Sequence, residues 1–78
     1  MPTVLRQGPY RFFFYASDRP EPIHVHVARE SAVAKFWLQP VRLARSSGLG
    51  RQELLDIQRI VIDNHRQLIE AWHEYFGR

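Results

Sequence analysis

The chain contains no cysteine, a single lysine and no long apolar run. Without cysteine it can form neither disulfide bonds nor a thiolate zinc site. No segment approaches the roughly 18 consecutive apolar residues that a membrane-spanning helix requires. The N-terminal residues also lack the apolar core of a signal peptide. We therefore expect a cytoplasmic protein without a membrane partner.

Length and charge set further bounds. A chain of 78 residues predicts a single domain over residues 1–78, and a domain of this size buries only about 60% of its unfolded surface. The net charge is +3 at pH 7, and all basic residues but one are arginine. Arginine favours an anionic partner because its planar group binds phosphate or carboxylate through paired hydrogen bonds. A GC-rich genome produces the same bias, so charge alone does not decide the function.

Four segments have the composition of β-strands. They are residues 3–6, 10–15, 24–29 and 32–38. The second is the clearest because of its aromatic residues. Turn sequences separate the first two strands at Gly8-Pro9 and the last two at Glu30-Ser31. This order predicts a mainly antiparallel four-stranded sheet.

Two helices are expected after the strands. Pro40 suits the first turn of a short helix through residues 41–44. Gly50 can cap a long helix over residues 51–76, whose large apolar side chains gather on one broad face at 100° per residue. These side chains are Leu54, Ile57, Val61, Leu68, Trp72, Tyr75 and Phe76. The fold class predicted is α+β: a four-stranded, mainly antiparallel sheet backed by a short helix and one long C-terminal helix.

Alternation along the strands indicates which face of the sheet the long helix covers. One face carries no charge, and we expect it to pack against the helix. It consists of Phe12, Phe14, Val25, Val27 and Phe36. The opposite face, called the outer face below, should be a basic surface interleaved with aromatic residues. Its members are Arg11, Phe13, Tyr15, His24, His26, Lys35 and Trp37.

His24 and His26 are two residues apart in a strand, so their imidazoles share the outer face. Three interpretations are open. They can be ordinary strand residues paired with cross-strand neighbours. They can transfer protons, because an imidazole pKa of roughly 6.5 suits acid–base work at neutral pH, with Arg11 and Lys35 holding phosphate. They can bind a metal ion.

A metal ion requires at least one more protein ligand. The sequence offers His65, Glu70, His73 and Glu74, which lie on the helix behind the sheet. For want of a converging third ligand we predict no metal site and no cofactor. If the protein is an enzyme, we expect a metal-independent, ribonuclease-like activity with His24 and His26 as the catalytic residues.

The aromatic residues of the outer face have two explanations. Phe13, Tyr15 and Trp37, placed among the cations Arg11 and Lys35, could stack on the bases of single-stranded nucleic acid. They could equally be covered by another chain, since small proteins seldom expose such a patch. We slightly favour the second explanation. The expected partners are a second copy of the chain, a small cognate protein, or both, with nucleic acid as a further candidate.

Five segments resemble domain-of-unknown-function family 4160, in the same order and with compatible spacing over almost the whole chain. They are Val4 to Arg6, Gly8 to Tyr15, Glu21 to Val27, Ala34 to Leu38 and Ala71 to Phe76. The resemblance implies a small bacterial or archaeal protein, often encoded beside a protein of domain-of-unknown-function family 2442 in a pair that looks like a toxin–antitoxin module. The family supplies no established catalytic residue.

The function expected on this basis is the toxin-like component of a two-gene toxin–antitoxin-like module. It would act through a protein partner, with RNA as a candidate target. Two alternatives stay open. One is a non-catalytic nucleic-acid-binding regulator that uses the same basic face. The other is a plain protein-interaction or assembly domain.

Overall fold

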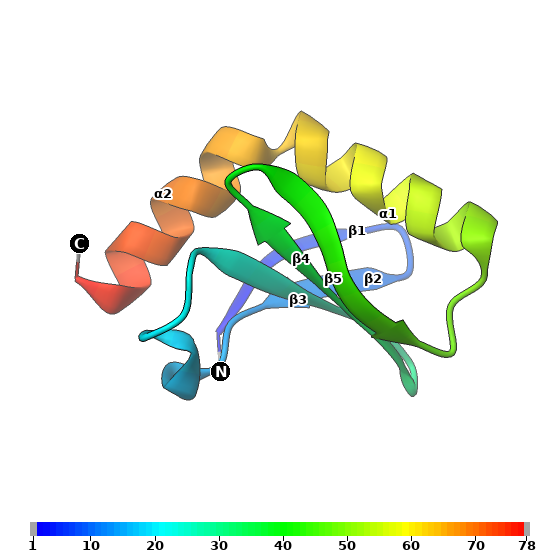
Figure 1. The fold of residues 1–78 in the computed structure, drawn as a ribbon, viewed down its shortest axis with the longest axis horizontal. Helices are drawn as coiled ribbons and strands as arrows, with labels where there is room; N and C mark the ends of the chain where they lie inside the picture. Colours follow the sequence, from blue (N-terminus) through cyan, green and yellow to red (C-terminus); the bar gives the residue numbers. More distant parts are fainter. Residues whose placement is uncertain (1, 78) are drawn as a thin grey trace.

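A computed structural model describes residues 2–77, which form a five-stranded antiparallel sheet with two helices along one side (Figure 1). Each strand pairs with the next one along the chain. The strands are β1 (Thr3–Gln7), β2 (Tyr10–Phe13), β3 (His24–Arg29), β4 (Ala32–Leu38) and β5 (Val41–Ser47). A 3-10 turn, η1 (Ala16–Asp18), precedes β3, and the helices α1 (Arg51–Asp63) and α2 (His65–Phe76) follow β5. The predicted α+β class is confirmed.

The predicted number of strands is wrong, because residues 41–47 form β5 and not a short helix. Pro40 lies in the tight turn between β4 and β5. Val41 and Leu43 flank Arg42, an alternation typical of a strand. A helix of four residues would satisfy almost none of its own backbone groups, whereas β5 pairs with β4 along its length.

The C-terminal helix spans the predicted residues but is interrupted at Asn64. The backbone of Asn64 has a ψ of 22°, which is outside the helical range. Its side-chain Nδ2 donates a hydrogen bond to the carbonyl of Ile60 at 2.8 Å. Asparagine side chains compete in this way with the helical hydrogen bonds of the backbone. The two helices therefore follow the sheet as an arc (Figure 1).

The core lies where the strand alternation places it, between the uncharged face and the helices. From the sheet it contains Phe12, Phe14, Val25, Val27 and Phe36, and from the helices Ile57, Val61, Leu68, Trp72 and Phe76. Leu54 is only partly buried, and Tyr75 is 39% exposed. Among the described residues, no helix combines the length and the apolar character needed to cross a bilayer.

An ion pair fastens the start of α1 to the sheet. Arg29 in β3 donates from Nη2 to Oε1 of Glu53 at 2.9 Å, and its Nε lies 2.7 Å from Oε2. The hydroxyl of Tyr10 also donates to Oε2, at 3.2 Å. The hydrogen bond from Arg29 lowers the pKa of Glu53 below its ordinary value. Burial, with the neighbouring Glu53, raises the pKa of Tyr10.

Candidate functional site

The outer face carries the residues that the alternation predicts, and β5 extends it. Phe13 pairs with His26, His26 with Lys35 and Lys35 with Arg45, so these side chains form a row across four strands. Trp37 pairs in the same way with Arg42. Neither arginine belongs to the predicted outer face, because the sequence predicts a short helix and not a strand after Pro40.

The outer face is less open than the sequence predicts. Phe13 is 3% exposed, Lys35 is 6% exposed and His24 is fully buried. The cause is the segment between β2 and β3, which folds back over one end of this face. Its Glu21 accepts a hydrogen bond from the ammonium group of Lys35. Tyr15, by contrast, is 42% exposed, as expected.

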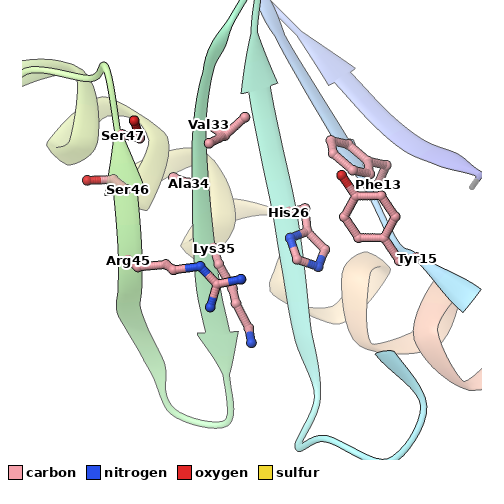
Figure 2. Close-up of a pocket in the computed structure, with 9 residues that line it drawn as sticks. All are labelled: Phe13, Tyr15, His26, Val33, Ala34, Lys35, Arg45, Ser46 and Ser47. Atoms are coloured by element: carbon pink, nitrogen blue, oxygen red, sulfur yellow. The ribbon is translucent and has the colours of Figure 1, made fainter. Parts of the chain in front are cut away.

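A pocket of about 200 Å³ opens on the outer face between β2 and β5 (Figure 2). Its lining consists of Phe13, Tyr15, His26, Val33, Ala34, Lys35, Arg45, Ser46 and Ser47. His26 lies between the aromatic rings on one side and the two basic side chains on the other (Figure 2). The pocket thus joins a titratable ring, two cations and an exposed aromatic ring.

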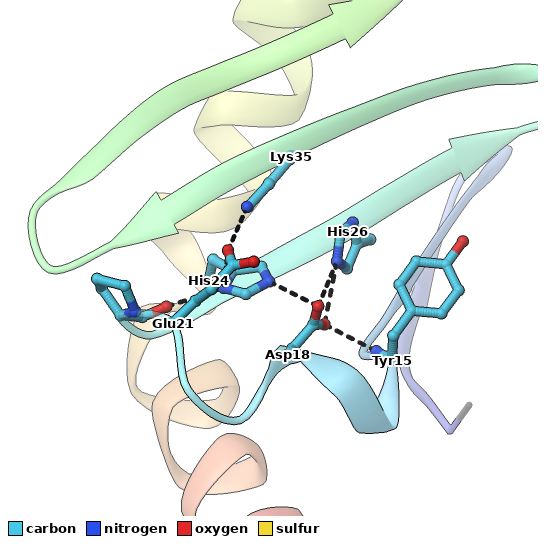
Figure 3. A network of polar contacts seen from close by, with 7 residues as sticks. Tyr15, Asp18, Glu21, His24, His26 and Lys35 are labelled. Atoms are coloured by element: carbon cyan, nitrogen blue, oxygen red, sulfur yellow. Dashed lines mark hydrogen bonds and ion pairs between the residues drawn. The ribbon is translucent and has the colours of Figure 1, made fainter.

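Asp18, at the end of η1, connects the two histidines of β3 (Figure 3). Its Oδ2 accepts a hydrogen bond from the backbone N–H of Tyr15 at 2.8 Å. Nε2 of His26 lies 3.0 Å from Oδ2, and Nε2 of His24 lies 3.2 Å from Oδ1. We call Asp18, His24 and His26 the His–Asp cluster.

Burial and charge act in opposite directions on the His–Asp cluster. Burial raises the pKa of Asp18, but the Tyr15 N–H and the two imidazoles outweigh it, so that this pKa is below its ordinary value. Burial lowers the pKa of His26 below its ordinary value, against the attraction of Asp18. Asp18 is therefore a carboxylate at neutral pH, and His26 is a neutral ring.

The expectation that no third ligand converges on the two histidines is wrong. Asp18, His24 and His26 each offer one ligand atom, and these atoms lie within 4.8 Å of one another. Asp18 belongs to a loop whose path the sequence does not reveal. One signal could have found it: the loop from β2 must return to the start of β3, where His24 lies, and Asp18 is its first carboxylate.

His65, one of the helix residues considered above as metal ligands, has a local structural role. Nε2 of His65 donates to the backbone carbonyl of Leu38, at the end of β4. This contact joins the start of α2 to the sheet on the face opposite the pocket. The other helix residues considered as ligands, Glu70, His73 and Glu74, do not belong to the cluster.

These observations define a small α+β protein with a five-stranded meander, a basic outer face and a His–Asp cluster beside a pocket. The chain belongs to the family described as a domain of unknown function, DUF4160, whose model matches residues 10–73. The predicted resemblance is confirmed, and the matched region contains the whole cluster. Neither the comparison with curated proteins nor that with solved structures gives a match.

Proposed function

We propose that the chain is the toxin-like component of a two-gene toxin–antitoxin-like module and that it binds single-stranded RNA at the outer-face pocket. The resemblance to the family supports the module. The RNA proposal rests on one observation: Arg45, the exposed Tyr15 and His26 line the same pocket.

The charges of the outer face favour a phosphate ligand. Glu21 neutralises Lys35, and the two histidines surround Asp18. Within residues 2–77, no carboxylate forms an ion pair with Arg45. Its guanidinium group is therefore available for an external anion, and it lines the pocket. Arginine binds phosphate through paired hydrogen bonds.

The aromatic wall suits an unpaired base. Tyr15 is 42% exposed at the pocket, and Phe13 supports it edge-on with ring centroids 5.3 Å apart. Stacking of a base on such a ring contributes about 1–3 kcal/mol. A pocket of about 200 Å³ is smaller than the about 300–1,000 Å³ that encloses a whole small-molecule ligand. We therefore place a single base of a longer strand in it.

If the bound strand is cleaved, we propose that His26 takes part. Within the His–Asp cluster it is the residue that lines the pocket, and its side chain is 12% exposed. His24 is fully buried, so it would act only through Asp18. A catalytic role for the two histidines stays a prediction.

Binding of a short fluorescent single-stranded RNA, measured by anisotropy at several salt concentrations, tests the proposal. Arg45→Gln should weaken binding and reduce the salt slope by about 0.7, the value for one phosphate contact of a single strand. Tyr15→Ala should weaken binding without changing the salt slope, because it removes stacking alone.

Arg59→Gln is the matched control, because it removes the same charge from an exposed position on α1. Equal losses in the Arg45 and Arg59 variants would mean that only net charge matters, which contradicts the pocket. Induced expression of the chain should slow growth, and the Arg45 variant should restore it. RNA binding without growth inhibition or RNA cleavage would favour the non-catalytic regulator.

A further inference from the structure

One nitrogen of a buried histidine has no hydrogen-bond partner. His24 is fully buried, and its Nδ1 lies 2.8 Å from the carbonyl oxygen of Pro22. A carbonyl oxygen only accepts, so Nδ1 carries the hydrogen. In the neutral ring Nε2 then carries a lone pair, and this atom has no hydrogen-bond partner. A buried polar atom left without a partner destabilises the fold.

The atom next to this lone pair is a second acceptor, which makes the arrangement less stable. Nε2 of His24 lies 3.2 Å from Oδ1 of Asp18, and the Asp18 side chain is only 7% exposed. A carboxylate oxygen is also an acceptor. Two buried lone pairs at this distance repel each other unless a positive species lies between them. That species is a proton or a metal ion.

The geometry of the third member of the cluster favours a metal ion. Nε2 of His26 lies 3.2 Å from Oδ1 and 3.0 Å from Oδ2 of Asp18. Metal bonds of about 2.0–2.2 Å at tetrahedral angles place neighbouring ligand atoms about 3.3–3.6 Å apart. The distances from Asp18 to the two imidazole nitrogens are therefore only a few tenths of an ångström shorter than those around a bound ion, and the three ligand atoms all lie within 4.8 Å of one another. Two imidazoles and one carboxylate form a ligand set typical of zinc and of other divalent transition metals.

We propose that Asp18, His24 and His26 bind a divalent transition-metal ion, with zinc as the leading candidate. The Pro22 carbonyl orients His24, and the Tyr15 N–H orients Asp18, as outer-shell partners do in metal sites. Binding requires a free lone pair on His26 Nε2, so the hydrogen of this neutral ring moves to Nδ1 and no net proton is released. Glu21 is no fourth ligand, because Lys35 engages it.

Three protein ligands leave a coordination position open for water or substrate. His26 lines the pocket, so we place the open position on the pocket side. The site does not depend on the proposed RNA binding, because the cluster and its outer-shell partners are complete without a ligand in the pocket.

Titration of the metal-free full chain with Zn²⁺, followed by calorimetry and by tryptophan fluorescence, tests the proposal. The ring centroids of both tryptophans, Trp37 and Trp72, lie 5.6 and 5.2 Å from that of His24. Fluorescence therefore reports directly on the cluster, and Co²⁺ or Cu²⁺ should quench it. We expect one Zn²⁺ per chain, and no comparable effect of Mg²⁺, which prefers oxygen ligands.

Asp18→Asn and His26→Gln should each weaken Zn²⁺ binding by at least about 100-fold, more than the about 10–100-fold caused by losing an outer-shell partner. His73→Gln, an exposed histidine of α2, is the control and should bind as the parent does. Circular dichroism checks that each variant is folded. If one of the two cluster variants does not fold, the Zn²⁺ affinity of the other tests the site.

Three results would overturn the proposal. The first is a parent chain that shows no saturable Zn²⁺ binding, which means that a proton joins His24 to Asp18. The second is binding that persists in both cluster variants. The third is binding that is lost in the His73 variant, which places the metal outside the cluster.

Discussion

His24 and His26 lie on the same face of β3, as their spacing predicts, but their surroundings differ. His24 is fully buried, and its ring contacts those of Trp37 and Trp72. His26 lines the pocket. The 3-10 turn that carries Asp18 produces this difference. His24→Ala is therefore no surface substitution, since it removes a ring from the protein interior, and Asp18→Asn or His26→Gln is the better probe of the site.

A single residue, Glu53, should make the stability of the fold depend on pH. Its pKa in the folded chain is lowered, first of all by the hydrogen bond from Arg29. A group with a lowered folded pKa stabilises above its unfolded pKa of about 4.3 and loses this contribution as the pH falls through the folded pKa. Glu53→Gln should therefore reduce stability at pH 7 and have less effect at pH 3, as measured by urea unfolding.

Glu70→Gln provides the control for the Glu53 variant. Glu70 is 72% exposed and lies 3.9 Å from Arg66 on the helix surface, where ion pairs contribute little. Its replacement should leave the urea midpoint nearly unchanged at both pH values. A Glu53 variant that is destabilised equally at pH 7 and pH 3 would show that packing, and not charge, holds α1 to β3.

At the scale of elements, the two helices act as one cover for the sheet despite their interruption at Asn64. Ile57 and Val61 from α1, and Leu68 and Trp72 from α2, belong to the same buried cluster. β-Sheets twist, so a single straight helix would leave part of the sheet uncovered. The bend at Asn64 lets both helices pack against it.

Leu68→Ala tests this packing. Leu68 is fully buried in the core, and truncation of a buried leucine costs about 2–5 kcal/mol through lost transfer energy and the cavity left behind. Leu55→Ala is the matched control, because Leu55 is 49% exposed on α1; its effect should stay within about 0.5 kcal/mol. Chemical denaturation measures both. A change below about 0.5 kcal/mol for Leu68→Ala would contradict the assigned core.

The elements also show how far the sequence determines the fold and the site. Strand alternation suffices to predict the buried face, because the uncharged side chains of that face are the ones that pack against the helices. It does not suffice for residues 41–47, because the preceding Pro40 is compatible both with the start of a helix and with a turn. Asp18 and Glu21 could not be placed either, since a loop position carries no periodicity and depends on tertiary contacts.

At the scale of the whole molecule, two faces have different roles. The helices cover one face of the sheet and the outer face carries the pocket (Figures 1 and 2). Among residues 2–77, six large apolar or aromatic side chains remain substantially exposed. They are Tyr15, Val33, Leu43, Leu55, Ile62 and Tyr75. That a further chain covers some of these side chains stays a prediction.

We predict that the purified chain is a homodimer or requires a cognate protein partner. Light scattering coupled to size exclusion at micromolar concentration measures the mass directly. A mass of twice 9.3 kDa, or aggregation that a co-expressed partner relieves, is expected. A stable monomer that stays in solution by itself would refute this prediction.

We propose that the pocket on the outer face is the functional site of the protein. Nuclear magnetic resonance of the ¹⁵N-labelled chain, titrated with a short single-stranded RNA, tests it most directly, because each backbone amide reports its own surroundings. We predict saturable shift changes concentrated at Phe13, Tyr15, His26, Arg45 and Ser46, which line the pocket. Changes centred on α1 and α2, or no saturable change at all, would contradict the claim.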